Sequence, residues 1–189
     1  YGLVGAALEF SDKDAADVGV PVADLVTVPR DATPDDIERL VAKHGYSRYP
    51  TTDEVTNPNK PGVVQGFQGG TVYWSEETGP KVVEGAILQA YREAGAENSE
   101  LGYPVTDEIA LDTRRGAFSR FQGGAIYWSP RTGAHVVPRG PVFDAWGTVD
   151  YERGRLGYPT GPLRNTSGGQ VMEFEGGRIT VSGGRAEIS

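Results

Sequence analysis

The 189-residue sequence contains no cysteine, which excludes disulfide bonds and thiolate metal sites. It has two histidines, His44 and His135, so few side chains are available as a catalytic base near neutral pH. No apolar run approaches the ~20 residues of a transmembrane helix. Residues 1–10 lack the basic start and apolar core of a signal peptide. We therefore expect no transmembrane segment and few routes to covalent or metal-dependent chemistry.

The sequence also lacks any long run of one charge. The formal net charge is −8, and the lysines and arginines are scattered along the chain. No basic stripe could neutralise a phosphate backbone, so nucleic acid is not expected as a partner. Glycine and proline, by contrast, are abundant, with 27 and 13 residues. This composition favours short strands joined by tight turns over a helical bundle.

The stretch at residues 121–129, Phe-Gln-Gly-Gly-Ala-Ile-Tyr-Trp-Ser, occurs in related form at 67–75 and 174–182. The copies lie about 54 residues apart, a period typical of an array of small structural units. Each copy joins two β-rich runs through Gly-Gly. A two-residue type I′ turn needs positive φ at both central positions, which glycine adopts freely. The pattern therefore predicts a hairpin centred on Gly-Gly.

Each hairpin is predicted to continue into a third strand. In the middle copy, strands at 117–122, 125–129 and 134–137 would form an antiparallel meander. The first copy follows the same order, and the last copy has two Gly-Gly turns and no helix after it. This makes the last copy suitable as the terminal unit of an array.

Apolar spacing predicts a helix before the second and the third meander. Residues 84–91 place Ile87, Ala90 and Tyr91 on one face, and Gly95 would end that helix. Residues 141–146 repeat the pattern. There the face is Val142, Ala145 and Trp146, and Gly147 would end the helix.

An earlier helix is predicted over residues 34–44. Thr33 suits the N-cap and Pro34 the first helical position, while Ile37, Leu40 and Val41 form an apolar face. The fold class that follows is α+β and β-rich overall. It consists of tandem repeats, each a short antiparallel three-stranded β-meander plus one helix.

The repeated motifs resemble the LGFP repeat family of mycolate-bearing actinobacteria. They are Leu-Gly-Tyr-Pro at 101–104 and 156–159, Phe-Gln-Gly-Gly, Tyr-Trp-Ser and Thr-Gly. The resemblance covers about residues 43–189, with Ser-Arg-Tyr-Pro in the first unit and Thr-Val in place of Tyr-Trp in the third. It divides the chain into an N-terminal segment at 1–42, repeats at 43–99 and 100–154, and a truncated repeat at 155–189.

The resemblance implies a function. LGFP repeats are appended to envelope enzymes, including mycolyltransferases and peptidoglycan hydrolases, and are thought to hold them on the cell wall. We therefore expect a non-catalytic, extracellular binding or anchoring module. Its partner would be a cell-envelope polysaccharide, arabinogalactan or peptidoglycan glycan, with an attached envelope enzyme as a further partner and no cofactor.

Residues 1–50 resemble the start of the first CBS motif of hemolysin-C-like membrane proteins. The second half of that motif, with its ribose-contacting residues, is absent, and half a motif cannot form the paired nucleotide cleft. Three other functions stay open. They are a CBS-type regulatory segment, which would place the chain in the cytoplasm, an enzyme of wall metabolism, and a fused or designed chain without evolved function.

Aromatic side chains carry the strongest functional signal. Strand alternation sends Tyr and Trp of each Tyr-Trp pair to opposite faces, so one ring goes inward and the other can stack on a sugar. The alternative is that both rings are core residues, which small repeats need. The candidate glycan-binding residues are Tyr73, Trp74, Tyr127, Trp128, Tyr103 and Tyr158.

Catalytic and metal-binding patterns are weaker. The adjacent acids Asp53-Glu54 and Asp107-Glu108 would point to opposite faces of an extended strand, so neither pair can act across one substrate. We expect these acids to accept backbone N–H bonds instead. The acids at 12, 14 and 17 lack the glycine and distal glutamate of a calcium loop. No catalytic or metal-ligating residue is predicted.

Overall fold

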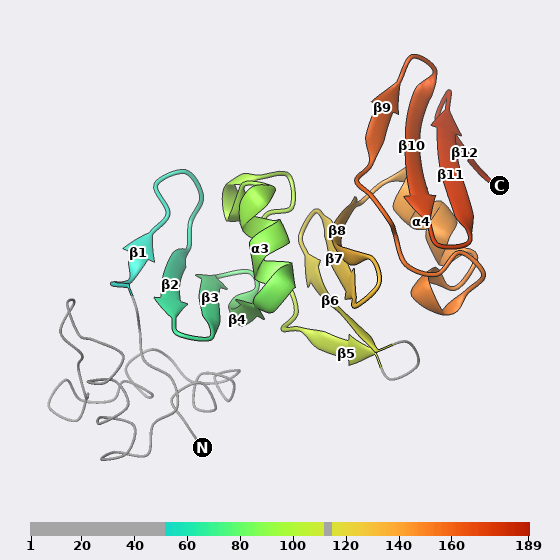
Figure 1. Ribbon diagram of the computed structural model, residues 1–189. Coiled ribbons are helices and arrows are strands. Elements are labelled where there is room, and N and C mark those ends of the chain that lie inside the picture. The colour runs from blue at the N-terminus through green and yellow to red at the C-terminus, as the bar shows by residue number, and fades with distance from the viewer. Residues whose placement is uncertain (1–51, 112–114) are drawn as a thin grey trace, which may run out of the picture.

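The computed structural model describes residues 52–111 and 115–189. The N-terminal segment with the CBS-like pattern and the helix predicted at 34–44 lie outside the described residues. The described chain forms a row of three antiparallel sheets (Figure 1). The α+β, β-rich class predicted from the sequence is therefore confirmed in outline.

Each sheet has four strands in meander order. The first contains β1 (Val55–Thr56), β2 (Val63–Phe67), β3 (Gly70–Ser75) and β4 (Gly79–Glu84). The second contains β5 (Ile109–Leu111), β6 (Gly116–Phe121), β7 (Gly124–Ser129) and β8 (Gly133–Pro138). The third contains β9 (Arg164–Thr166), β10 (Gly169–Phe174), β11 (Gly177–Ser182) and β12 (Arg185–Ile188).

The prediction of three strands per unit is wrong because the segment after each Tyr-Pro adds a short edge strand. Pro104 forms an isolated bridge with Phe121, and Pro159 forms one with Phe174. These bridges lead the chain alongside β6 and β10, where β5 and β9 then pair. The edge strands have two or three residues and are mostly exposed, so they carry no alternating pattern to recognise.

The predicted type I′ Gly-Gly turn is also wrong in the second sheet. Phe121 pairs with Gly124, so the loop residues are Gln122 and Gly123, and neither glycine has a positive φ. Glycine is needed at 123 for another reason, since a Cβ there would overlap the carbonyl oxygen of Glu100. The predicted turn is confirmed between β11 and β12, where Gly183 and Gly184 have φ of 55° and 78°.

Two α-helices among the described residues separate the sheets, and both were predicted. Helix α3 (Gly85–Glu93) leads into the 3-10 helix η3 (Ala96–Asn98), and α4 (Pro141–Gly147) leads into η4 (Tyr151–Arg153). Gly95, at φ 100°, ends the first helix as expected. Figure 1 shows α3 between the first two sheets and α4 beside the third.

One aromatic side chain of each helix contacts the sheets on both sides. Tyr91 of α3 lies 5.1 Å from Tyr73 of the first sheet and 4.4 Å from Phe121 of the second, between ring centroids. Trp146 of α4 lies 4.7 Å from Tyr127 of the second sheet and 5.1 Å from Phe174 of the third. Both helix rings are fully buried. Truncating such a ring typically costs about 3–5 kcal/mol, so the helices are the main connection between units.

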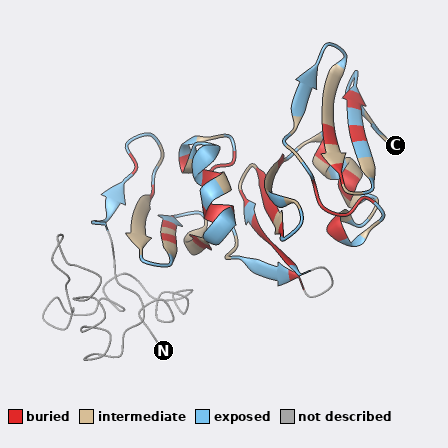
Figure 2. Ribbon diagram, in the orientation of Figure 1, coloured by how far each residue is buried: buried red, intermediate tan, exposed pale blue. Residues whose placement is uncertain are grey.

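Buried residues accordingly form two clusters, one around each helix (Figure 2). The second sheet contributes to both, because alternate residues of β7 face opposite ways. Ile126 packs in the α3 cluster and Tyr127 in the α4 cluster. Within residues 52–111 and 115–189, no helix is long and apolar enough to cross a membrane.

Candidate functional site

The Leu-Gly-Tyr-Pro and Phe-x-Gly-Gly motifs bind each other in the structure. Gln122 accepts a hydrogen bond from the Tyr103 backbone N–H through Oε1 at 2.8 Å, and its own N–H donates to the Tyr103 carbonyl oxygen at 3.0 Å. Gly123 donates to the Leu101 carbonyl oxygen at 2.7 Å. We call this contact the turn junction.

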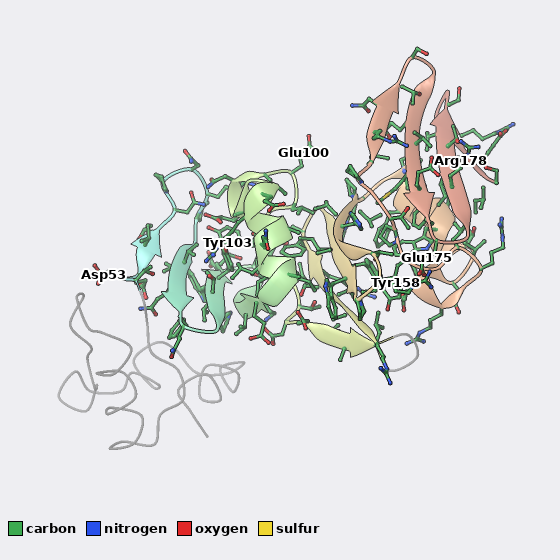
Figure 3. All side chains as sticks on the ribbon, in the orientation of Figure 1. Asp53, Glu100, Tyr103, Tyr158, Glu175 and Arg178 are labelled. Atoms are coloured by element: carbon green, nitrogen blue, oxygen red, sulfur yellow. The ribbon has the colours of Figure 1, made fainter. Side chains whose placement is uncertain are left out.

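The third sheet has the same turn junction. Glu175 accepts a hydrogen bond from the Tyr158 backbone N–H through Oε2 at 3.1 Å, and its own backbone N–H donates to the Tyr158 carbonyl oxygen at 2.9 Å. Gly176 donates to the Leu156 carbonyl oxygen at 2.9 Å. Figure 3 shows Tyr158 and Glu175 together at the foot of that sheet. The two motifs that define the repeat in sequence are thus the two sides of one backbone contact.

The loop between β1 and β2 is attached to η3. Asn57 donates from Nδ2 to Oε1 of the buried Glu97 at 2.9 Å, and the Lys60 ammonium donates to the Ser99 carbonyl oxygen at 3.1 Å. Asn57 Oδ1 also accepts the backbone N–H of Asn59 at 2.8 Å. These bonds hold Lys60 beside the ring of Tyr103.

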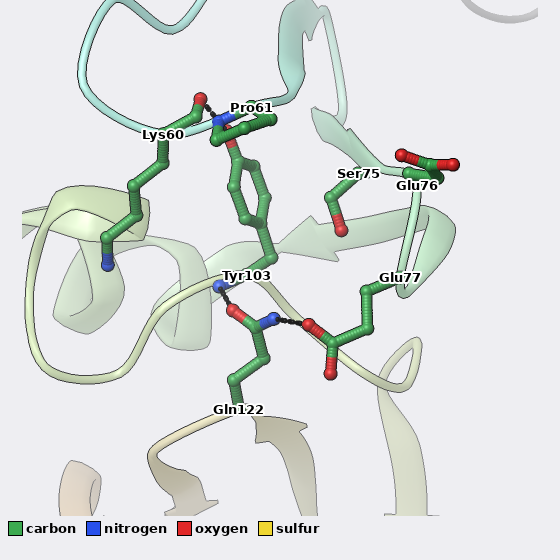
Figure 4. A pocket seen from close by; sticks show the side chains of 7 residues that line it. All are labelled: Lys60, Pro61, Ser75, Glu76, Glu77, Tyr103 and Gln122. Carbon is green, nitrogen blue, oxygen red and sulfur yellow. Dashed lines mark hydrogen bonds between the residues drawn. The ribbon is translucent and has the colours of Figure 1, made fainter.

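An open pocket of about 470 Å³ lies where these elements meet. That volume falls within the usual range of small-ligand sites, roughly 300–1,000 Å³. Figure 4 shows the Tyr103 ring standing between Lys60 and the turn that joins β3 to β4. The pocket is lined by Lys60, Pro61, Ser75, Glu76, Glu77, Tyr103 and Gln122.

Several polar groups of the pocket are held in place by hydrogen bonds. Gln122 Nε2 donates to Glu77 Oε2 at 2.6 Å (Figure 4), and Ser75 Oγ lies 2.8 Å from Thr78 Oγ1. Burial is the main cause that raises the pKa of Tyr103, with the charge of Glu97 adding to it. The neutral Tyr103 hydroxyl donates to the Lys60 carbonyl oxygen at 3.4 Å. The site offers an aromatic ring edged by carboxylate, amide and ammonium groups.

The six aromatic residues predicted as a glycan site lie in different places. Four tyrosines are buried, between 1 % and 3 % exposed, and lack the open ring face that stacking needs: Tyr73, Tyr103, Tyr127 and Tyr158. Tyr103 nevertheless lines the pocket with part of its surface. Trp128 is half-buried and packs against the α3 cluster, whereas Trp74 is 44 % exposed.

In the second of the two predicted acid pairs, Asp107 and Glu108 have separate surroundings. Asp107 Oδ1 accepts the backbone N–H of Val82 at 2.7 Å, which attaches the loop after Tyr-Pro to β4 of the preceding sheet. Burial, and secondly the charge of Glu84, raise the pKa of its neighbour Glu108. His135 Nε2 lies 2.8 Å from the Thr132 carbonyl oxygen, a contact with the backbone of its own hairpin. Across the described ranges, no cluster of three or more His, Cys, Asp or Glu could hold a metal.

Comparison with protein families identifies the repeat. The model of the LGFP repeat matches residues 49–99 and 101–154, together more than half of the 189 residues. The chain belongs to the LGFP repeat family. A search of curated proteins finds no match to it. LGFP repeats are a non-catalytic family found in cell-envelope proteins.

The two matched LGFP repeats contain the first two sheets, and the pocket spans their boundary. Its residues come from the β1–β2 loop, the β3–β4 turn, the Leu-Gly-Tyr-Pro segment and the next hairpin turn. Sequence reasoning identified Tyr103 but not Lys60, Glu76, Glu77 or Gln122. No local signal marks these four, because they lie up to 62 positions apart (122 − 60) and meet only when the repeats stack.

Proposed function

We propose that this LGFP repeat protein binds a cell-envelope polysaccharide, with one or two sugar rings seated in the pocket between the first and second sheets. The observation that supports this is the combination, in one open pocket, of the exposed Pro61 and the part of Tyr103 that lines it with carboxylate, amide and ammonium groups. Sugar rings present apolar C–H faces edged by hydroxyls. Their recognition therefore needs apolar contact and directional hydrogen bonds together.

The polar lining favours a neutral saccharide such as arabinogalactan. Glu76 and Glu77 supply carboxylate oxygens that accept hydrogen bonds from sugar hydroxyls, and Lys60 supplies a donor. Two carboxylates against one ammonium, in a chain with a net charge of −8, oppose an anionic polymer. Peptidoglycan glycan is the second choice, because its peptide stems carry carboxylates.

The residues around the pocket favour binding over catalysis. A serine nucleophile needs a neighbouring base, whereas Ser75 Oγ is paired with the Thr78 hydroxyl. Glu77 is already hydrogen-bonded to Gln122. We propose an extracellular, wall-attached role in which the repeats hold an attached envelope enzyme near its polymer.

Retention on insoluble arabinogalactan–peptidoglycan tests the proposal. The parent chain should be retained, and Lys60→Ala or Glu76→Ala should weaken the apparent affinity about tenfold, the loss of one or two directed hydrogen bonds to a ligand. Glu187→Ala is the matched control, because Glu187 is an exposed glutamate on β12 of the third sheet. Failure of the parent chain to be retained would overturn the proposal.

Trp74 marks a second candidate surface, favoured by its 44 % exposure. Trp74→Ala and Trp128→Ala belong in the same retention series. If Trp74→Ala abolishes retention while the pocket variants bind like the parent, the saccharide site lies on the outer face of the first sheet. We expect the opposite order, with the pocket variants the more strongly affected.

A further inference from the structure

The boundary between the second and third sheets is built like the boundary that holds the pocket. A Cβ on Gly62 would overlap the Tyr103 hydroxyl, so that ring lies directly against the backbone just before β2. In the same way, a Cβ on Gly116 would overlap the Tyr158 hydroxyl, so the ring of Tyr158 lies against the first residue of β6. The tyrosine of each Leu-Gly-Tyr-Pro segment thus contacts the sheet before its own.

The turn beside each of these contacts is also repeated. In the first sheet, Ser75 Oγ lies 2.8 Å from the hydroxyl of the threonine three positions later, and Ser129 Oγ makes the same contact at 2.8 Å in the second sheet. Glu77 and Arg131 therefore occupy equivalent positions in the β3–β4 and β7–β8 turns. Each of these two side chains contacts the hairpin turn of the next sheet. The second boundary repeats the construction of the first.

The charged side chains at the two boundaries have opposite signs. The compared positions are those that line the pocket and the residue before each Leu-Gly-Tyr-Pro segment, whose carbonyl oxygen faces the next hairpin turn. At the first boundary they carry three carboxylates and one ammonium, those of Glu76, Glu77, Glu100 and Lys60. At the second, the described residues carry three guanidiniums and one carboxylate, those of Arg115, Arg131, Arg155 and Glu175. An acidic surface is thus followed by a basic one along the array.

Arg131 has hydrogen-bond donors available for a ligand. Its side chain is 84 % exposed, and its Nη1 lies 3.3 Å from Glu175 Oε1. A guanidinium has five N–H donors, so this ion pair leaves most of them available. The Glu175 side chain is only 15 % exposed and its other oxygen accepts the Tyr158 N–H, so the exposed charges of this surface are those of the arginines. Beside Arg131, Pro130 is exposed, as Pro61 is at the first boundary.

We propose that this surface binds the carboxylate of an acidic saccharide, with Arg131 and Arg115 as its charged contacts and Pro130 under the apolar face of the sugar ring. Guanidinium groups pair with carboxylates in a bidentate geometry that fixes orientation as well as charge. The net charge of −8 opposes acidic ligands elsewhere on the chain, so the attraction is local to this basic surface. The choice of a saccharide rests on the proposed function. The two boundaries then select neutral and acidic sugars in turn along one polymer.

Calorimetric titration of the full chain with trigalacturonate tests the proposal, and the fully methyl-esterified trisaccharide is the matched neutral ligand. We expect the ester to bind at least about tenfold more weakly than the acid, because it lacks the charge. Arg131→Ala should weaken trigalacturonate binding about tenfold, the loss of a charge-assisted contact. Arg131→Lys should weaken it about threefold, because an ammonium keeps the charge and loses the bidentate geometry.

Arg115 and an arginine outside this surface supply the second variant and the control. Arg115→Asn removes the charge at a residue with φ of 50°, a conformation that asparagine tolerates, and should weaken binding about threefold or more. Arg185→Ala removes an exposed guanidinium from β12, at the end of the third sheet away from the Glu175 turn, and should leave binding unchanged. The far-ultraviolet circular dichroism of each variant should match that of the parent, since all three arginines are exposed.

Trigalacturonate binding that depends on both arginines and on the free carboxylates supports the proposal. No binding, equal binding of the ester, or an equal loss in Arg185→Ala would overturn it. So would full displacement by inorganic phosphate at the same concentration, which would reveal a simple anion site. Sedimentation at low salt covers the remaining alternative. Self-association of the parent that Arg131→Ala abolishes would show that a second copy occupies the surface, against the proposal.

These outcomes are separate from retention on the wall polymer, which tests the pocket through Lys60 and Glu76. Retention without trigalacturonate binding leaves the proposed function standing and removes this inference. Trigalacturonate binding without retention does the reverse, because the basic surface then stands as a site for acidic saccharides while the wall polymer is not the ligand of the chain.

Discussion

Gly123 and Gly176 occupy one position in successive repeats, and a Cβ at either would overlap a backbone carbonyl oxygen, that of Glu100 or Arg155. Because the obstacle is backbone, it cannot move aside as a flexible side chain could. The sequence identified this position by repetition alone but assigned the wrong cause, a positive φ. A positive φ and a close approach by another backbone segment each require glycine. The sequence alone does not show which of the two causes applies.

Replacing Gly123 by alanine should therefore destabilise the protein. We expect Gly123→Ala to lower the free energy of unfolding by about 2–3 kcal/mol, as overpacking at a fixed contact does. Urea denaturation followed by fluorescence measures it. The control is Gly161→Ala, where a Cβ meets nothing within 4 Å; it should lie within about 0.5 kcal/mol of the parent or above it. Equal midpoints for the two variants would contradict the close-approach account.

At the scale of elements, the position of a sheet relative to the helices decides whether a residue is core. Tyr127 and Thr180 occupy equivalent positions on β7 and β11, and both point toward the side where a following helix would lie. Helix α4 covers Tyr127, which is 3 % exposed, whereas Thr180 is exposed. Within the described residues, this strand position is therefore a core position in the second sheet and an exposed one in the third.

Exchanging these residues should have unequal effects. Tyr127→Thr should lower the free energy of unfolding by roughly 3–4 kcal/mol, because it removes a ring that contacts Phe118 and Trp146 in the core. Thr180→Tyr should change stability by less than about 0.5 kcal/mol, since its site is exposed. Both are measured by urea denaturation. A loss above 2 kcal/mol for Thr180→Tyr would mean that this face is covered in solution.

Some elements could be predicted from the sequence and others could not. The two helices were predictable because Ile87 with Tyr91, and Val142 with Trp146, repeat an apolar i, i+4 spacing before a glycine. The edge strands were not, because pairing geometry and not their own residues places them. The pocket was missed for a related reason. Lys60, Glu77 and Gln122 have no pattern in common and are brought together by the stacking of repeats.

At the scale of the whole molecule, the same pair of turn positions forms a side-chain contact at both boundaries between units. The residues that form it differ between the two boundaries. Glu77 accepts from Gln122 at 2.6 Å between the first and second units. Arg131 pairs with Glu175 at 3.3 Å between the second and third. We call these the inter-repeat bridges. A glutamate on both sides would repel, so the residue in each β3–β4 type turn has to match the residue in the next hairpin turn.

A double-mutant cycle should reveal this matching. Gln122→Glu keeps an acceptor for the Tyr103 N–H, as Glu175 does for Tyr158, but sets two carboxylates together. We expect Gln122→Glu to lower the free energy of unfolding by about 0.5 kcal/mol, the size typical of interactions between exposed charges. The loss should be smaller in 1 M NaCl, because salt screens the repulsion. Adding Glu77→Arg should restore it by recreating the second bridge. The free energies of unfolding are measured by thermal or urea denaturation. If the effects of Gln122→Glu and Glu77→Arg simply add in the double variant, the two positions do not have to match.

The buried tyrosines along the array make the whole molecule sensitive to alkali. Burial, with the charge of Glu97 second, raises the pKa of Tyr73 to about 12. Burial is also the largest cause that raises the pKa values of Tyr91, Tyr103 and Tyr127. Above pH 10 the unfolded chain loses these protons while the folded chain keeps them, so the folded state binds more protons. Stability is therefore complete below pH 10 and falls as the pH rises through 10 toward 12.

We expect the Tm to fall by roughly 10 °C between pH 9 and pH 11.5, a loss of a few kcal/mol in a chain of this length. Absorbance at 295 nm should show these tyrosines ionising together with unfolding and not near pH 10. Tyr73→Phe separates this effect from the deprotonation of lysines, because it removes one buried hydroxyl and should make the alkaline fall shallower. Ionisation of all nine tyrosines near pH 10 with the fold intact would contradict it, since rings sandwiched between sheet and helix cannot ionise without opening the array.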